Sequence, residues 1–202
     1  MNPYIRLSNY SFFFKEKRIF ENINFTLYQK DRIGICGING SGKSTFLRIL
    51  SSIYDNNLIS SNLNICPILS SGVGLLDSLT VIENIKRLSY LMNVKFIDEK
   101  KLNEILLKFE LNDKQDTKVY YLSSGYKIRI FYVIFFITNF DIIFLDEFVN
   151  LGDHKFQTII KDKFTSKLKT TTLVMASHDI SLLRKFCTKI YVIKNFNLEL
   201  LQ

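Results

Sequence analysis

The segment from Gly37 to Thr45, GINGSGKST, combines residue types that can hold a chain of phosphates. Its three glycines let the backbone turn tightly, so that several N–H groups point inward toward phosphate oxygens. The ammonium group of Lys43 would lie between the last two phosphates, and the hydroxyl group of Ser44 would bind Mg²⁺. The segment predicts a nucleotide site whose residues are Gly37, Asn39, Gly40, Ser41, Gly42, Lys43, Ser44 and Thr45.

A second group of chemically useful residues follows an apolar run at Ile142–Leu145, which ends in Asp146 and Glu147. A buried parallel strand would expose these carboxylates at its carboxyl end, where α/β proteins bind ligands. Asp146 is suited to hold Mg²⁺, directly or through water, and Glu147 is suited to polarise an attacking water molecule. A strand that ends in Asp-Glu is common by itself, but together with the phosphate loop it predicts nucleoside triphosphate hydrolysis.

The residues on either side of the phosphate loop have the patterns of strands and a helix. Apolar and polar residues alternate at Ile23–Tyr28, and a short apolar run at Arg32–Cys36 leads directly into the glycines, so both segments are expected to be strands. Apolar residues then follow with helical spacing from Thr45 to Leu50. Strand, glycine loop and helix in this order are the context that the phosphate motif requires.

Two amphipathic helices are expected between the phosphate loop and Leu122. Thr80 and Glu83 have the spacing of a capping box in front of an apolar-periodic helix that runs to Tyr90. A second amphipathic helix is expected from about Asp98 to Phe109. These two helices form a helical insertion in an otherwise α/β chain, and the helical subdomain is expected at about 78–138.

From Ser124 onward, helices and strands are expected to alternate. The order is a helix from Ser124, a strand at Ile142–Leu145, a helix at about His154–Lys167, a strand at Thr172–Ala176, a helix at Ile180–Phe186 and a strand at Lys189–Ile193. Such alternation implies a mainly parallel sheet with helices on both faces. At 202 residues the chain suffices for one well-buried domain, which is expected to span 1–202.

Composition argues against a membrane span, and charge alone identifies no partner. The apolar stretch at Ile128–Leu145 is interrupted by charged and polar residues, so we expect a buried helix and strand there rather than a membrane span. The net charge is +8, but basic and acidic residues are mixed without a basic block, so charge alone leaves open whether a basic surface meets nucleic acid or anionic lipid headgroups. Taken with the motifs below, no nucleic-acid partner is expected. Three widely spaced cysteines are expected to be packing residues: Cys36, Cys66 and Cys187.

Two further motifs indicate a family. Leu122–Tyr126 has the sequence LSSGY ahead of an expected helix, and Ser177–Asp179 has the sequence SHD after an expected strand. Together with GINGSGKST and IIFLDE, these motifs resemble those of the ATP-binding cassette (ABC) ATPases over nearly the whole chain. The resemblance implies an α/β P-loop NTPase fold, with a mostly parallel sheet, an N-terminal antiparallel β part and a helical insertion that carries the signature loop.

The resemblance also implies a dimer. LSSGY is similar to the family's signature loop, which is normally LSGGQ, and in this family two cassettes close head to tail around two ATP·Mg²⁺. The residues of one chain that would meet the γ-phosphate held by the other are Ser123, Ser124 and Gly125. Asn150–Asp153 would occupy the loop that crosses the dimer.

Two more residue roles follow from the resemblance. His178 matches the switch histidine that contacts the γ-phosphate, so the implied catalytic residues are Lys43, Glu147 and His178. Tyr10 lies where the family places an aromatic side chain that stacks on adenine, with Phe12–Phe14 as alternatives.

A narrower resemblance points to one kind of transporter within this family. Tyr121–Tyr126 is similar to a YSSGM form of the signature, Asp146–Asp153 to a DEVxxVGD segment and Ser71–Gly74 to a GAGF stretch. All three are features of the ATPase subunits that export capsule, O-antigen or teichoic-acid polysaccharides. As a departure, no glutamine lies between Gly42 and Gln115, so the glutamine that usually links Mg²⁺ to the membrane subunit is absent from its place.

These resemblances imply an ATP-hydrolysing subunit, peripheral on the cytoplasmic face of the cell membrane, that drives export of a lipid-linked cell-surface polysaccharide. The expected cofactors are ATP and Mg²⁺, and the expected partners are an integral membrane permease and a second cassette. The alternatives are an ABC ATPase for another transported substrate, a non-transport ABC ATPase that acts on the ribosome or on DNA, and a degenerate cassette that binds ATP and only scaffolds.

Overall fold

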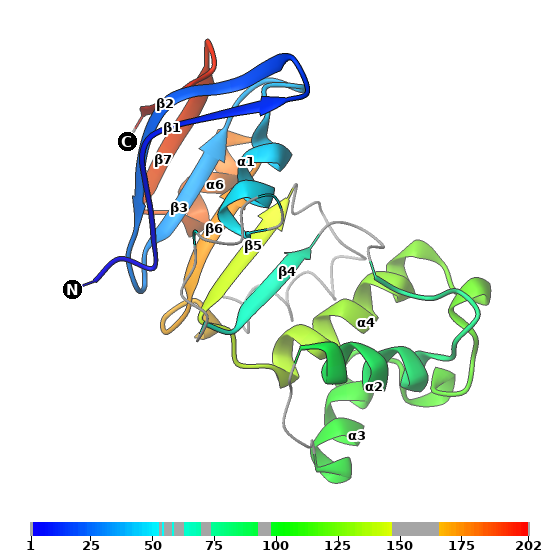
Figure 1. The fold of residues 1–202 in the computed structure, drawn as a ribbon. Helices are drawn as coiled ribbons and strands as arrows, with labels where there is room; N and C mark the ends of the chain where they lie inside the picture. Colours follow the sequence, from blue (N-terminus) through cyan, green and yellow to red (C-terminus); the bar gives the residue numbers. More distant parts are fainter. Residues whose placement is uncertain are drawn as a thin grey trace. The chain divides into compact units, whose positions relative to one another are not determined.

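A computed structural model describes residues 2–52, 54, 58, 63–69, 74–92, 98–146 and 166–201. These residues fall into two units, whose elements are labelled in Figure 1. The first unit holds the described residues within 2–69, 140–146 and 166–201, and the second holds those within 74–139. In the chain, the second unit therefore interrupts the first, and the segment at about 78–138 that we expected to be helical lies in it.

The first unit is built on a sheet whose strand order, among the described residues, is β4-β5-β6-β3-β7-β8. The strands are β3 (Arg32–Cys36), β4 (Ile65–Leu69), β5 (Ile142–Asp146), β6 (Thr172–Ala176), β7 (Lys189–Lys194) and β8 (Asn197–Leu200). Neighbouring strands pair in parallel except for β8, which returns antiparallel to β7. The central strands β3, β5 and β6 are buried along almost their whole length, as expected for near-continuous apolar runs covered on both faces.

A separate antiparallel pair, β1 (Ile5–Phe14) and β2 (Lys17–Leu27), shares its core with helix α1 (Lys43–Leu50). Phe20 and Phe25 on β2 both meet Phe46 on α1 edge to face, with ring centroids 5.5 and 5.3 Å apart. Buried aromatic pairs of this kind contribute packing energy beyond the area that they bury. They hold α1, and with it the loop that precedes α1, against the core of the first unit.

The second unit contains α2 (Val81–Leu91), α3 (Glu99–Lys108) and α4 (Ser124–Ile137), with short 3₁₀ turns at Asn112–Lys114 and Val119–Tyr121. The capping box predicted for α2 is present, because the Thr80 hydroxyl accepts from the Glu83 N–H and the Glu83 carboxylate accepts from the Thr80 N–H at 2.7 Å. Among the described helices, none has the length and apolar character needed to cross a membrane.

Several expected elements coincide with the observed ones. The strands at Arg32–Cys36 and Thr172–Ala176 and the helix α6 at Ile180–Phe186 agree residue for residue. Strand β4 was not expected. It contains Pro67, which cannot donate to a strand ladder, and among the described strands it lies at the edge of the sheet, where a proline is tolerated. The helix expected at about His154–Lys167 lies largely outside the described residues.

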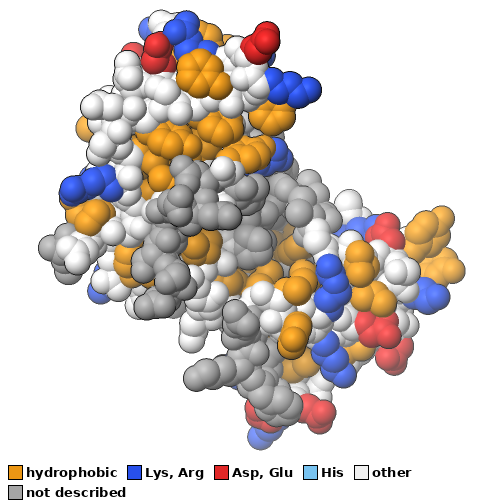
Figure 2. All heavy atoms as spheres, viewed as in Figure 1, with side chains coloured by type: hydrophobic (Ala, Val, Ile, Leu, Met, Phe, Trp, Pro, Cys, Tyr) orange, Lys and Arg blue, Asp and Glu red, His pale blue; other side chains and the backbone are white. Residues whose placement is uncertain are grey.

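The described surface and interior agree with two expectations from composition. All three cysteines are buried and free, and burial raises the pKa of each thiol, that of Cys187 to about 12. Their side chains therefore pack as small neutral groups. On the face shown in Figure 2, Lys and Arg side chains are interspersed with Asp and Glu.

Candidate functional site

Three of the predicted site segments follow neighbouring strands at the same end of the sheet. Asp146, the last residue of β5, pairs with Ala176, the last residue of β6, and Ala176 in turn pairs with Ile35 near the end of β3. Because these strands are parallel, the residues that follow them emerge together at their carboxyl ends. The fold thus brings Asp146, His178 and the phosphate loop to the carboxyl end of the parallel strands.

Lys43 is folded back over the phosphate loop. Its side chain is 5% exposed, and its Nζ donates to the carbonyl oxygens of Gly37 at 2.9 Å and of Ile38 at 3.1 Å. These neutral acceptors hold the ammonium group at the inside of the loop. Phosphate oxygens are stronger partners for a cation because they carry charge, so a bound triphosphate would compete for this ammonium.

Two glycines of the loop have positive φ and leave little room for a side chain. Gly42, the N-cap of α1, has φ of 103°, and a Cβ there would lie 3.0 Å from the ring of Phe20 in the core. A Cβ on Gly37 would lie 2.5 Å from the hydroxyl oxygen of Ser41. The loop therefore runs close to the core, and its course favours residues without a side chain. Of the other predicted loop residues, Asn39 is exposed and Ser44 is half-buried.

The two helices that begin at the phosphate loop and at LSSGY differ from the other described helices at their N-termini. Neither α1 nor α4 has a side-chain cap or an acidic residue in its first turn. In contrast, Thr80, Asp98 and Asp179 cap α2, α3 and α6. Uncapped N–H groups at the positive end of a helix are suited to bind an anion. The motifs therefore start the two described α-helices whose N-termini are open to a phosphate.

The start of α4 is held by the segments that precede α2. Backbone N–H groups of Val119 and Tyr120 donate to the carbonyl oxygens of Leu79 and Asp77 at 2.9 and 3.0 Å. The Asp77 carboxylate also pairs with Lys127 in α4 at 2.8 Å. These contacts fix the LSSGY segment and leave the side chains of Ser123 and Ser124 exposed and Gly125 half-buried.

Tyr126, which departs from the usual signature residue, packs among cations within the second unit. The guanidinium carbon of Arg129 lies 4.9 Å from its ring centroid and the ammonium of Lys114 lies 5.1 Å from it. Arg129 is also ion-paired with Glu110. Cation–π contacts of this kind stabilise an aromatic ring in place, so Tyr126 serves to pack the first turn of α4.

Asp146 has the properties of a cation ligand. Its Oδ1 atom is buried and makes no hydrogen bond to any described residue. A buried carboxylate oxygen without a partner is costly unless a cation satisfies it, and carboxylate and hydroxyl oxygens are ligands that Mg²⁺ accepts. The described residues contain no cluster of three metal-ligating side chains. Mg²⁺ in nucleotide sites needs only one or two protein ligands beside water and phosphate, so Asp146 and Ser44 fit this ion.

His178 is exposed, and its two neighbours fix the backbone around it. The Ser177 hydroxyl accepts from the Asp179 N–H at 3.0 Å, and the Asp179 carboxylate accepts from the N–H groups of Ser181 at 2.8 Å and Leu182 at 3.1 Å. Sequence reasoning gave Ser177 and Asp179 no role, although Asp before an expected helix is a capping signal. Glu147, predicted as the catalytic base, lies outside the described residues, as do Asn150–Asp153.

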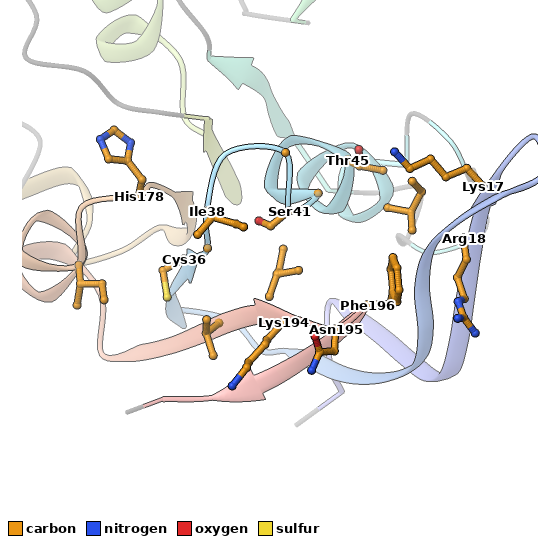
Figure 3. Close-up of a pocket in the computed structure, with 17 residues that line it drawn as sticks. Lys17, Arg18, Cys36, Ile38, Ser41, Thr45, His178, Lys194, Asn195 and Phe196 are labelled. Carbon is orange, nitrogen blue, oxygen red and sulfur yellow. The ribbon is translucent and has the colours of Figure 1, made fainter.

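A cavity of about 760 Å³ lies beside the phosphate loop (Figure 3). Gly37, Ile38, Gly40, Ser41, Gly42 and Thr45 of the loop and helix α1 line it together with Lys17, Arg18, Ile19, Cys36, His178, Ile180, Val192, Ile193, Lys194, Asn195 and Phe196. Tyr10 is not in this wall; it is half-buried and packs against the core of the first unit. Phe12 stacks on Tyr54, and Phe13 and Phe14 are each 54% exposed. The adenine contact expected from Tyr10 stays a prediction.

A family model described as ABC transporter matches residues 20–150. The chain belongs to the ABC transporter family. It is the ATP-binding subunit of an ABC transporter and an ATP hydrolase. ATPases of this family work with membrane permease subunits.

Individual ABC relatives align over most of the chain. It is 30% identical over 182 residues to the ATP-binding protein BexA of Haemophilus influenzae. This alignment covers 89% of this chain and 82% of the relative. It is 33% identical over 186 residues to the teichoic acids export ATP-binding protein TagH of Staphylococcus epidermidis, with 89% and 69% covered. It is 31% identical over 175 residues to the O-antigen export system ATP-binding protein RfbE of Yersinia enterocolitica, with 85% and 73% covered.

The ABC fold is also found by comparison with solved structures. A structure titled as the ATP-binding subunit of an ABC transporter superposes with a TM-score of 0.82 and 17% identity, covering 96% of this chain and 87% of the other. The predicted fold class, an α/β ABC ATPase with a mostly parallel sheet and an N-terminal antiparallel β part, is confirmed.

Proposed function

We propose that this ABC ATPase drives export of a lipid-linked cell-surface polysaccharide through a separate membrane permease. The observation that carries the proposal is the agreement between relatives and motifs. TagH and RfbE, which are named for teichoic acid and O-antigen export, align with at least 85% of the chain. The segments at Tyr121–Tyr126 and Asp146–Asp153 resemble those of polysaccharide exporters. In this role the chain lies against the inner face of the cell membrane, bound to its permease.

ATP would bind with its phosphates at the open N-terminus of α1. The Lys43 ammonium would leave the carbonyl oxygens of Gly37 and Ile38 and bind phosphate oxygens, whose charge makes them better acceptors. Mg²⁺ held by Asp146 and Ser44 would neutralise charge on the terminal phosphates. Glu147 would polarise the attacking water, and His178, in the cavity wall, would contact the γ-phosphate.

A second copy of the chain would complete each site. The uncapped start of α4, with Ser123, Ser124 and Gly125, is an anion-binding helix end that this chain's own described contacts leave without a side-chain cap. In a head-to-tail dimer it would meet the γ-phosphate held by the partner. Two ATP·Mg²⁺ would then lie between two chains, and hydrolysis would let the dimer open.

The export proposal is tested by replacing the chromosomal copy with a Glu147→Gln variant in the source organism. This change removes the proposed base with little change of shape, so we expect surface polysaccharide to be lost while its lipid-linked form accumulates inside the cell. Glu104→Gln, on the exposed side of α3, is the matched control and should export normally. Normal surface polysaccharide in the Glu147→Gln strain would contradict the proposal.

The partner is tested with the same variant. Purified with ATP from detergent-solubilised membranes, the Glu147→Gln protein should carry a polytopic membrane protein in stoichiometric amount. Ribosomal or DNA-bound partners in its place would leave the ATP hydrolase standing and overturn the transport function.

A further inference from the structure

The turn between β7 and β8 carries an unexpected residue. Lys194 pairs with Asn197, so Asn195 and Phe196 form a two-residue hairpin loop, and both have left-handed backbones with φ of 48° and 63°. Turns of this kind favour Asn and Gly, because a bulky side chain is strained in that conformation. Asn195 suits the turn, whereas Phe196 stands where glycine would be the easier residue. Strained residues are often retained where their side chains are used.

The Phe196 ring is held by β2. The guanidinium carbon of Arg18 lies 5.0 Å from the ring centroid, and Arg18 pairs with the Glu21 carboxylate at 2.7 Å. The backbone N–H of Glu21 donates to the Phe196 carbonyl oxygen at 2.9 Å. Two contacts thus join the turn to β2, and the ion pair within β2 holds Arg18 against the ring. In Figure 3 the ring rises from the turn beside Arg18.

The ring lies in the wall of the cavity that contains the phosphate loop. Phe196 is 44% exposed. Among the described residues that line this cavity, it is the one with a phenyl ring. His178 and the loop line the same cavity, while Ile19 and Lys17 lie in its wall with Phe196. If the triphosphate lies at the start of α1, the part of the cavity that is lined by β2 and the β7–β8 turn is left for the nucleoside.

We propose that Phe196, with Arg18 against its ring, contacts the base of the bound nucleotide and adds affinity for the nucleoside end. The proposal rests on the placement of the phosphates at α1 described under the proposed function. Every base presents a π-face to an aromatic ring, so the contact strengthens binding of purine nucleotides without selecting one of them. It also explains why a strained aromatic residue occupies the turn in place of glycine.

Phe196→Gly tests this contact, because glycine adopts the left-handed backbone without strain and the variant should fold at least as stably as the wild type. We expect its Kd for ATP to rise about tenfold, the size expected for loss of one stacking contact. Binding of inorganic tripolyphosphate, which has no nucleoside, should not change. Phe196→Tyr, which keeps the ring, should bind ATP like the wild type, and so should Tyr90→Ala, a change at an aromatic residue of α2 that is 83% exposed.

Two results would overturn the proposal: unchanged ATP affinity in Phe196→Gly, or equal losses for ATP and tripolyphosphate. A Phe14→Ala variant that loses ATP affinity while Phe196→Gly does not would assign the base contact to β1 instead. Failure of the underlying function is seen separately, because Lys43→Ala should lose both ligands. A wild-type protein that binds neither ligand would remove the nucleotide site itself.

Discussion

Lys43 and Asp146 hold charge ready for a ligand in two different ways. The Lys43 ammonium is buried and satisfied by two carbonyl oxygens of its own loop. The Asp146 Oδ1 atom is buried and has no hydrogen-bond partner among the described residues. The lysine must therefore exchange partners when phosphate arrives, whereas the carboxylate gains a partner when a cation arrives. These differences lead to separate predictions for the two residues.

Lys43→Ala should weaken ATP binding about a hundredfold, because it removes a charged donor to the phosphates. Titration calorimetry with ATP measures the change, and Lys169→Ala, at an exposed lysine, is the charge-matched control. The variant should stay folded, since the carbonyl oxygens of Gly37 and Ile38 can bind water at the open loop. An affinity equal to that of the wild type would exclude Lys43 from the phosphate site.

Asp146→Asn should remove the dependence of ATP binding on Mg²⁺. The wild type is expected to bind ATP more tightly with Mg²⁺ than with a chelator, and the variant should bind with the same affinity in both conditions. Without nucleotide, its thermal unfolding temperature should not fall, because the buried Oδ1 atom makes no hydrogen bond to a described residue that the change would break. Asp113→Asn, at an exposed side chain, is the control. A Mg²⁺ dependence retained in Asp146→Asn would assign the metal to other ligands.

At the scale of elements, the sequence predicts those parts whose cause is local. Thr80 and Glu83 lie at capping-box spacing, and the box is present. The short apolar run at Arg32–Cys36, which ends at the glycines, is β3. Strand β4 was not predicted. A run of five residues that contains Pro67 is compatible with a strand only at an edge or an irregular position, and that position is a property of the assembled sheet.

The same limit applies to the candidate site. The phosphate loop and Asp146 can be predicted from motifs, because their proposed chemistry depends on residues adjacent in sequence. The contact between Phe196 and Arg18 joins residues that are far apart in the chain, and no local pattern announces it. The absent caps of α1 and α4 become meaningful only beside the caps that the other described helices possess.

The capping box of α2 should make the stability of the second unit depend on pH. The pKa of Glu83 is lowered from 4.5, chiefly by the hydrogen bond from the Thr80 backbone N–H. A carboxylate whose pKa is lower in the folded state stabilises the fold at pH values above its unfolded-state pKa. This contribution is lost as the pH falls through the folded-state pKa. Glu83→Gln keeps the acceptor oxygen but cannot ionise.

Urea unfolding of wild type and Glu83→Gln, followed from about pH 7 downward, checks this dependence. The wild type should be the more stable at neutral pH, and the difference should shrink once the pH passes below 4.5, the ordinary glutamate value. Glu104→Gln on α3 should give no such trend, as its side chain is exposed. A difference that does not vary with pH would assign the effect of Glu83 to something other than its charge.

At the scale of the whole molecule, the two helix ends that are open to phosphate among the described helices belong to different units. α1 begins in the first unit and α4 in the second. The proposed head-to-tail dimer assigns the α1 end of each site to one chain and the α4 end to the other. Ser123→Asp is suited to block the second end, because aspartate is a favourable N-cap for α4 and places a carboxylate where phosphate would bind.

Mixing two inactive variants tests whether each site is shared. Lys43→Ala and Ser123→Asp should each abolish steady-state ATP hydrolysis, the latter without loss of stability. In a mixed dimer, the Lys43 of one chain faces the Ser123 of the other, so one of the two sites is intact. Random association makes half of the dimers mixed, and the equimolar mixture should recover up to about a quarter of wild-type turnover.

Lys43→Ala mixed with the double variant offers no intact site and should stay inactive. If the first mixture also stays inactive while dimers form, each site is completed within one chain and the shared-site dimer is wrong.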